Sequence, residues 1–287
     1  MTTLVETLRA VGMTPPDYLP LGRFRRFPGC GKPRGNTAGW CKLITPTLAV
    51  YGDWSTGLSE TWTDETHVDD ETSRRLLAEA RERERQAREQ LQADRAEAAQ
   101  EARRLIAKAK LDRHPYLAMK GFPDTIGLVL DGKLIVPMRD VRHYRKVLSC
   151  QLIDADGTKK FLPRGRASGA VYRLGGLTDA RKIAICEGYS TALSVYEALK
   201  RLDPTCVVVA ALSAHNLTEV APWYLRRDRK VFVVADNDVS GAGQRAAAAT
   251  ALPYWMPPIV GEDFNDFYQR LGLFKCIGTL REFLHEV

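Results

Sequence analysis

The 287-residue sequence contains no apolar run near the roughly 20 residues needed to span a bilayer. Its first residues, Met1–Gly12, also lack the apolar segment of a secretory signal peptide. Hydrophobic residues make up 45% of the chain and charged residues 27%, which excludes a wholly disordered or collagen-like protein. We therefore expect a globular protein of the cytoplasm, with a bacterial cell as host and without membrane contact.

Closely spaced cysteine pairs are also missing. The six cysteines are scattered, and Cys30 and Cys41 stand alone in the N-terminal region, far from His67. A zinc ribbon needs four ligands in two close pairs, so zinc is not expected, and the cysteines are interpreted as free thiols. No G-x-x-x-x-G-K-[ST] motif occurs either. The chain therefore has no helicase motor of its own, and any unwinding would require a separately encoded helicase.

Proline and glycine are absent from residues 65–111, where Arg, Glu, Gln and Ala dominate. This composition predicts one long helix. Leu77 and Leu91 fall on a seven-residue spacing, but Asp94 and Glu101 occupy core-like positions between its members, which disfavours a coiled-coil seam. Two interpretations stay open: a solvated spacer packed by one thin stripe, and a self-associating helix.

The region before this helix reads as a small β-rich module. Short strand patterns alternate with Gly- and Pro-containing loops, and basic residues stand beside aromatic ones. The aromatic residues either form the core of the module or stack on nucleic-acid bases, and the arginines are candidates for phosphate contact. The residues concerned are Arg23, Arg25 and Arg26, with Phe24, Phe27, Trp40 and Trp54.

A net charge of +7 arises from 42 Lys and Arg against 35 Asp and Glu. A polyanionic partner is consistent with this excess. The distribution is more informative than the sum, because the basic residues concentrate in the N-terminal module and around residues 139–166.

Apolar strands alternate with helices in the last third of the chain. Strands are predicted at 182–186, 206–211 and 231–235, and helices at 189–202, around 218–226 and at 240–251. This alternation predicts a parallel sheet covered on both faces. Residues of about 115–177 carry further strands, so the overall class is α/β, or α+β when the N-terminal module is included.

Acidic residues follow two of these strands directly. Glu187 follows the strand that ends at residue 186, and Asp236 and Asp238 follow the strand that ends at residue 235. Ligands of such sheets bind at the carboxyl ends of the strands, and carboxylates there suit Mg²⁺ or Mn²⁺. Asp263 and Asp266 come later and could reach the same site. Acids at strand ends also cap helices, which is the plainer interpretation.

Two motifs resemble a known family. Residues 187–192, Glu-Gly-Tyr-Ser-Thr-Ala, are similar to the EGYxTA motif of primases from phages and conjugative plasmids, and with Asp236-Asn-Asp238 they resemble a Toprim domain. Residues 135–140 and 160–163 are similar to upstream segments of bacterial replicative primases. The resemblance covers about residues 113–272. It departs where bacterial primases carry a further acid after the glutamate, since Ser190 and Thr191 stand there.

The resemblance implies a DNA-dependent primase, a nucleotidyltransferase that makes short RNA primers on single-stranded DNA from ribonucleoside triphosphates, for phage, plasmid or mobile-element replication. It implies Glu187, Asp236 and Asp238 as catalytic residues and metal ligands, joined by Asp263 and Asp266. It also implies that Arg139, Lys160 and Arg164 contact nucleotide or DNA. Two alternatives stay open: a Toprim nuclease, and a nucleic-acid-binding accessory protein with a vestigial site.

Four segments follow from these patterns. They are a template-binding module resembling a degenerate zinc ribbon (1–64), a helical spacer (65–112), the N-terminal subdomain of the primase core (113–178) and a Rossmann-like Toprim catalytic domain (179–287).

Overall fold

A computed structural model describes residues 3–64 and 70–286. The chain divides into two compact units, Met1–Leu91 and Gln92–Val287, with the boundary inside a long helix. Each unit is described by itself. The finer division into four segments stays a prediction, and its boundary at residues 64 and 65 touches residues outside the described part.

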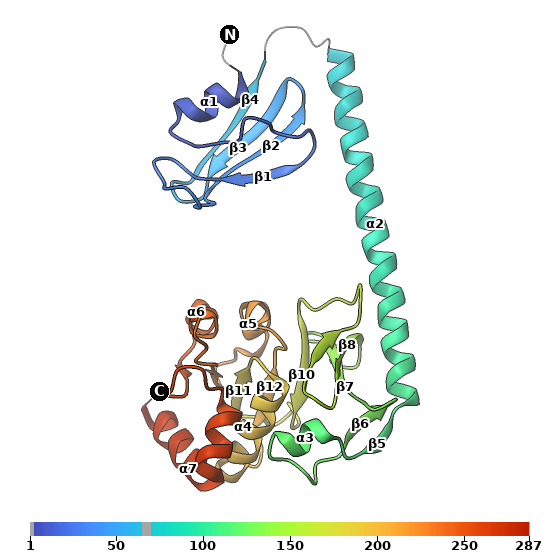
Figure 1. The fold of residues 1–287 in the computed structure, drawn as a ribbon, viewed down its shortest axis with the longest axis vertical. Helices are drawn as coiled ribbons and strands as arrows, with labels where there is room; N and C mark the ends of the chain where they lie inside the picture. The colour runs from blue at the N-terminus through green and yellow to red at the C-terminus, as the bar shows by residue number, and fades with distance from the viewer. Residues whose placement is uncertain (1–2, 65–69, 287) are drawn as a thin grey trace. The chain divides into compact units, whose positions relative to one another are not determined.

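The first unit is a four-stranded antiparallel sheet with strand order β1-β2-β3-β4 and one short helix, α1 (Figure 1). Leu4 and Leu8 of α1 pack against Phe27 and Tyr51 of the sheet and form a small core. The short α1 was not predicted, and a capping box between Thr3 and the third helical residue begins it. The elements are α1 (Leu4–Ala10), β1 (Phe24–Phe27), β2 (Gly39–Thr45), β3 (Leu48–Asp53) and β4 (Leu58–Thr63).

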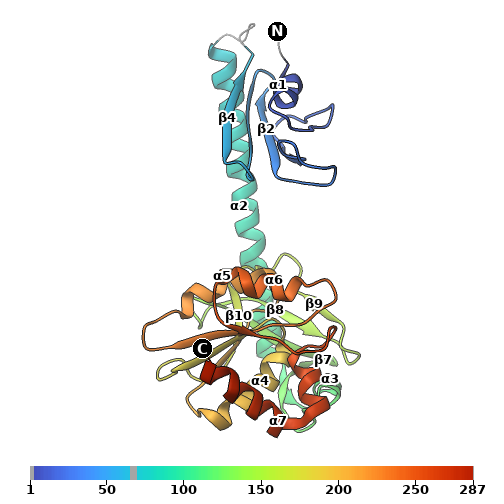
Figure 2. The ribbon, with the colours of Figure 1, turned by 90° about the vertical axis from the view of Figure 1, so that its left-hand side faces the viewer.

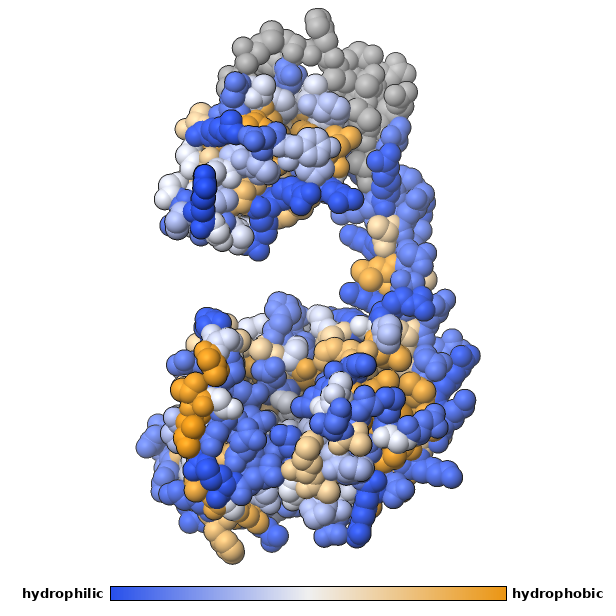
Figure 3. Space-filling view, in the orientation of Figure 1, coloured by the Kyte–Doolittle hydropathy of each residue, from blue (hydrophilic) through white to orange (hydrophobic). Residues whose placement is uncertain are grey.

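Outside the part drawn in grey, helix α2 (Asp70–Lys108) carries mostly hydrophilic side chains (Figure 3). Pairs such as Arg85 with Glu82 and Glu89, at 2.6 and 2.7 Å, support it from within. Its last turns pack Ala102 against the sheet of the second unit. The helix ends earlier than the predicted residue 112, because residues 110–112 form a strand instead.

The second unit is built on one mixed ten-stranded sheet. Its strand path is β14-β13-β11-β12-β10-β7-β6-β5, and β8 and β9 extend from β7. Strands β14, β13, β11 and β12 are parallel, whereas β10 runs antiparallel to β12 and joins them to the antiparallel part. The strands are β5 (Lys110–Asp112), β6 (Gly127–Leu130), β7 (Lys133–Asp140), β8 (Val147–Ile153), β9 (Lys159–Phe161), β10 (Ala170–Leu174), β11 (Lys182–Cys186), β12 (Val207–Ala210), β13 (Lys230–Val234) and β14 (Tyr254–Trp255).

Helices cover both faces of the parallel strands, as the sequence predicted (Figure 2). Helices α4 and α7 lie on one face, and α5 and α6 lie on the other. The strands alternate accordingly, since Ala184 and Cys186 face α4 while Ile183 and Ile185 face α5. The helices are α3 (Pro115–Met119), α4 (Tyr189–Leu202), α5 (Ala214–Val220), the 3₁₀ helix η1 (Ala221–Tyr224), α6 (Ala242–Ala249) and α7 (Phe264–Glu286).

The helix predicted around residues 218–226 is misplaced. Helix α5 begins at Ala214 and gives way at Ala221 to a 3₁₀ turn that contains Pro222. Proline lacks the N–H that an α-helix needs there. The buried Asn216 side chain also links α5 to the start of β10, because its amide donates a hydrogen bond to the Ala170 carbonyl at 2.7 Å. The mixed α+β fold class is otherwise confirmed. Within the described residues, no helix is both long and apolar enough to span a membrane.

Candidate active site

Parallel pairing brings two of the predicted acids to the same edge of the sheet. Strands β11 and β13 are neighbours, with Cys186 opposite Val234. Glu187 directly follows β11, and Asp236 follows β13 after one residue. Both acids therefore lie at the carboxyl edge of the sheet. Gly188, in extended backbone, then begins α4. The local sequence therefore sends the chain away from the sheet immediately after the carboxylate, as an edge-binding site requires.

Asp236 is the most perturbed carboxylate of this edge. Burial, together with the nearby charges of Asp263 and Glu187, raises its pKa to about 7. Its Oδ1 atom is buried and has no hydrogen-bond partner. Burial, with a contribution from Asp238, also raises the pKa of Glu187. An unpartnered oxygen among carboxylates that repel one another fits a divalent cation, which would supply the missing positive charge.

Asp238 is hydrogen-bonded to the loop that leads into α6. Its carboxylate accepts hydrogen bonds from the Ser240 hydroxyl and from the N–H groups of Ala242 and Gly243, at 3.1 and 2.7 Å for the two amides. These bonds lower the pKa of Asp238 to about 2. The side chain thus holds the loop that begins α6 and stays charged. Asp238 therefore caps the start of α6, as the plainer interpretation expected. Its charge also acts on Asp236 and Glu187.

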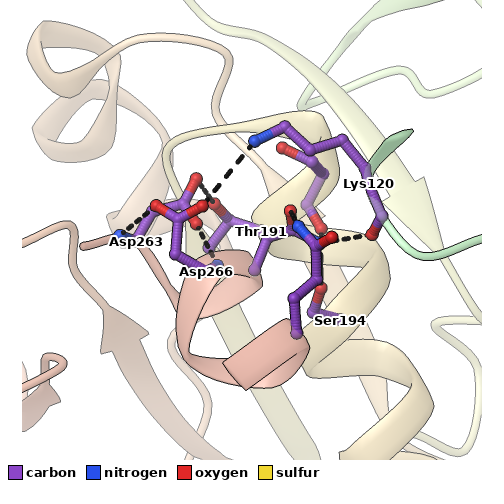
Figure 4. Close-up of polar contacts among 8 residues, drawn as sticks. Lys120, Thr191, Ser194, Asp263 and Asp266 are labelled. Carbon is purple, nitrogen blue, oxygen red and sulfur yellow. Dashed lines mark hydrogen bonds and ion pairs between the residues drawn. The ribbon is translucent and has the colours of Figure 1, made fainter. Parts of the chain in front are cut away.

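Asp263 and Asp266 lie at the start of α7. The Asp263 carboxylate accepts the Asp266 N–H at 2.8 Å, and the Asp266 carboxylate accepts the Asp263 N–H at 3.2 Å. The other Asp263 oxygen accepts the Thr191 hydroxyl at 3.2 Å (Figure 4). Asp263 acts electrostatically on Asp236, whereas Asp266 lies 3.9 Å from the Lys120 ammonium. Asp263 therefore influences the Asp236 carboxylate, whereas the charge contact of Asp266 is with Lys120.

A buried polar network fixes the start of α7. The Asn265 amide donates to the Lys120 carbonyl at 2.8 Å and to the Ser194 hydroxyl at 2.9 Å (Figure 4). Thr191, Ser194 and Asn265 are all buried. Thr191 stands in the EGYxTA motif, where bacterial primases are expected to carry an acid. Here it orients the Asp263 carboxylate instead.

Lys159 is a site residue that the sequence analysis missed. Its charge acts to lower the pKa values of both Glu187 and Asp236, and its ammonium lies 5.5 Å from the ring centre of Tyr116. The predicted Lys160 is its neighbour in β9, and successive side chains of a strand point to opposite faces. Lys160 pairs across the sheet with Leu152, which packs on the α2 side. Strand alternation is the signal that separates the two lysines, but it requires the register of β9.

Arg139 lies at the end of β7 beside an arginine that was not predicted. The Arg139 and Arg173 guanidinium carbons lie 5.6 and 3.9 Å from the ring centre of Tyr144. Tyr172 packs on the other face of the sheet, where its ring centre lies 5.1 Å from that of Tyr189 at the start of α4. Among the described residues, neither guanidinium forms an ion pair with a carboxylate. Two cations that both lie near one tyrosine ring suit a phosphate-bearing ligand.

The remaining predicted basic residues lie apart from the carboxylates. The exposed Arg164 is 3.3 Å from Glu97 and 3.6 Å from Asp94, both on α2. Arg23 precedes β1, and Arg25 and Arg26 lie within it, in the first unit. The assignment of these residues to nucleic acid stays a prediction.

Among the described residues, no group of three or more His, Cys, Asp or Glu side chains is arranged to hold a metal ion. The six cysteines are free thiols. The case for a cation therefore depends on the Asp236 oxygen and the surrounding charges.

Comparison with known proteins finds a family match over the residues that form this edge of the sheet. Residues 182–273 match the family model of the Toprim domain. Two curated relatives from Escherichia coli, both named DNA primase TraC, are similar in sequence. One is 31% identical over 194 residues, which cover 64% of this chain and 13% of the relative. The other is 34% identical over 132 residues, covering 43% and 12%. The chain thus spans a small part of these relatives.

Two solved structures are more distantly similar. One is a chain from a bacteriophage T7 complex of the lagging-strand DNA polymerase with primase domains. It is 18% identical with a TM-score of 0.39, over 59% of this chain and 91% of that chain. The other is a DNA primase domain from Pseudomonas aeruginosa, also 18% identical, with a TM-score of 0.36 over 51% and 50%. Residues 182–273 thus match the Toprim domain family, and the chain is similar over part of its length to proteins named DNA primase TraC.

Proposed function

We propose that the second unit is a metal-dependent primase that joins ribonucleotides on a single-stranded DNA template. The observation that carries the proposal is the Asp236 carboxylate of the Toprim domain, with an unpartnered buried oxygen among three other acids. Sequence similarity to DNA primase TraC supplies the reaction class.

Asp236, Asp238, Glu187 and Asp263 are the proposed ligands of Mg²⁺ or Mn²⁺. Such a cation, once bound, would neutralise triphosphate charge and stabilise the attacking and leaving oxygens. Asp238 brings a carboxylate that is already ionised, because its hydrogen bonds hold its pKa near 2. Asp266 is the weaker candidate, because Lys120 lies beside it.

The chain's own side chains then act on the two substrates. A ribonucleotide 3′-oxygen attacks the α-phosphate of the incoming triphosphate, pyrophosphate leaves, and the hydroxyl proton passes to a base. Glu187 is the proposed base, because burial raises its pKa above the ordinary value of a glutamate. Lys159 beside the carboxylates, and Arg139 with Arg173 at the end of β7, would hold phosphates in position.

Primer synthesis by the purified full chain tests this proposal. Single-stranded DNA, Mg²⁺ or Mn²⁺ and labelled ribonucleotides should yield labelled oligoribonucleotides. Asp236→Asn and Glu187→Gln should each reduce the product at least about 100-fold. Asp228→Asn is the matched control, since that exposed acid lies in the turn before β13, away from the carboxyl edge. It should leave product formation unchanged.

The same assay can contradict the proposal in two ways. Shortened template without primer would indicate a Toprim nuclease, whose chemistry the same carboxylates allow. Template binding without either product would indicate an accessory protein. A separately encoded helicase and a phage or plasmid origin stay predictions, as does the cytoplasmic location.

A further inference from the structure

The four-stranded sheet of the first unit has two unlike faces. Side chains of a strand alternate between the faces, so the register assigns each residue to one of them. Phe27, Cys41 and Tyr51 point to the face that α1 covers and form the core there. Phe24 and Trp40, at positions of the opposite parity, point to the other face.

This second face carries three aromatic rings in mutual contact. The ring centres of Phe24, Trp40 and Trp54 lie 5.6–5.9 Å apart, and their planes differ by 16–30°. Phe24 is 48% exposed and Trp54 is 55% exposed. Gly52 makes room for the indole of Trp40, because a Cβ atom there would lie 2.6 Å from the ring. We call Phe24, Trp40 and Trp54, with Arg26, the aromatic face.

Charge on the aromatic face has one sign. The Arg26 guanidinium lies 4.5 Å from the ring centre of Trp54 and donates a hydrogen bond to the Thr37 carbonyl at 2.9 Å. Lys42 stands opposite Phe24 across β1 and β2. The acids of these strands, Asp53 and Glu60, belong to the covered face by strand alternation. Among the described strand residues, the aromatic face therefore presents cations without carboxylates.

Exposed rings with cations and no acids are the requirements of a single-stranded nucleic acid. Unpaired bases stack on aromatic rings, and phosphates are held by Arg and Lys. A paired duplex hides the faces of its bases and would use only the cations. The sequence allowed two roles for the four aromatic residues, packing in the core or stacking on bases. The structure places Phe27 in the core and the other three outside it.

We propose that the aromatic face binds single-stranded nucleic acid by stacking bases on Phe24 and Trp54, with phosphate contacts at Arg26 and Lys42. This inference depends on the proposed function only in naming the bound strand as primase template. The binding itself requires no catalytic activity.

Binding of labelled oligonucleotides to the full chain, followed by fluorescence anisotropy at fixed salt, tests the proposal. Two probes of about 12 nucleotides are compared, oligo-dT and an abasic strand with the same number of phosphates. Phe24→Ala and Trp54→Ala should each weaken oligo-dT binding by roughly 5- to 100-fold. Both should leave the abasic strand nearly unaffected. Trp54→Phe should restore most of the affinity, which separates stacking from misfolding.

Matched controls lie in the same unit. Tyr18 is an aromatic residue with 77% exposure outside the aromatic face, and Tyr18→Ala should not change either affinity. Arg26→Gln should weaken binding of both probes and lower the salt dependence by about one ion. Arg9→Gln, in α1 on the covered face of the sheet, should do neither.

Unchanged oligo-dT affinity in Trp54→Ala would overturn the inference, and so would equal losses for the two probes. Asp236→Asn separates it from the proposed function, because that variant should lose primer synthesis and keep oligo-dT binding. If the wild-type chain makes no primers but Trp54→Ala still loses oligo-dT, the proposed function fails and the aromatic face stands.

Discussion

At the scale of single residues, the buried Asp236 carboxylate lowers the stability of the folded protein when it ionises. Its carboxylate lies among Asp263, Glu187 and Asp238, and one oxygen has no partner. Burial of a charge without a counter-charge opposes ionisation, so the folded protein retains this proton up to a pH of about 7. The unfolded chain releases it near its ordinary pKa of 3.8. Stability should therefore fall as the pH rises between these two values.

Asp236→Asn should remove that pH dependence. At pH 8 without metal, we expect the variant to have a free energy of unfolding about 1–3 kcal/mol above that of the wild type. Near pH 4 the two should be almost equally stable, because the wild-type carboxyl is then protonated. Urea unfolding in EDTA measures the difference. Adding Mg²⁺ should reduce the gap at pH 8 by stabilising the wild type alone, and a gap independent of pH and metal would contradict this account.

At the scale of elements, the loop between β13 and α6 shapes the site. Asp236 and Asp238 stand in this loop, and Gly243 in the first turn of α6 packs against it. A Cβ atom at residue 243 would lie 2.3 Å from the Asp236 carbonyl oxygen and 3.2 Å from an Asp238 carboxylate oxygen. Glycine is thus required there by close approach, so that the helix can begin against the two acids.

Gly243→Ala should disturb this loop although alanine favours helices. We expect a loss of about 1–3 kcal/mol in unfolding free energy from overpacking, and a primer yield that falls with it. Gly278→Ala in α7 is the matched control, because no atom lies within 4 Å of its would-be Cβ. That substitution should stabilise the protein by about 0.4–1 kcal/mol. Thermal unfolding of both variants is the measurement, and equal effects would refute the close-approach argument.

At the scale of the whole molecule, chemistry and the aromatic face belong to different units. Every proposed metal ligand lies in Gln92–Val287, together with the ten-stranded sheet and both helix layers. The aromatic face lies in Met1–Leu91. Each unit has its own hydrophobic core, so each has what it needs to fold by itself.

A fragment of residues 92–287 should therefore fold alone. We expect one cooperative thermal transition and the stabilisation by Mg²⁺ proposed for the full chain. The fragment should bind oligo-dT at least about 10-fold more weakly, because it lacks the aromatic face. Calorimetry and anisotropy on the purified fragment measure these properties. Undiminished oligo-dT affinity would place the binding surface in the second unit instead.

Much of this protein follows from its sequence alone. Apolar runs alternating with helical segments determined the parallel strands and their cover on both faces, because burial on two sides requires continuous apolar strands. The placement of Glu187, Asp236 and Asp238 at one edge of the sheet was predictable, because the carboxyl ends of neighbouring parallel strands meet there. The long helix was evident from the absence of proline and glycine in residues 65–111.

Tertiary structure decided what depends on register and on distant partners. The choice between Lys159 and Lys160 is a matter of strand parity, which only the pairing of β9 with β8 reveals. Arg173 joins Arg139 because β10 pairs with β7, a contact that local sequence does not encode. Phe24 and Phe27 are the same residue type in the same short strand. Phe27 belongs to the core because α1 packs on its side of the sheet, and Phe24 on the other side is left exposed.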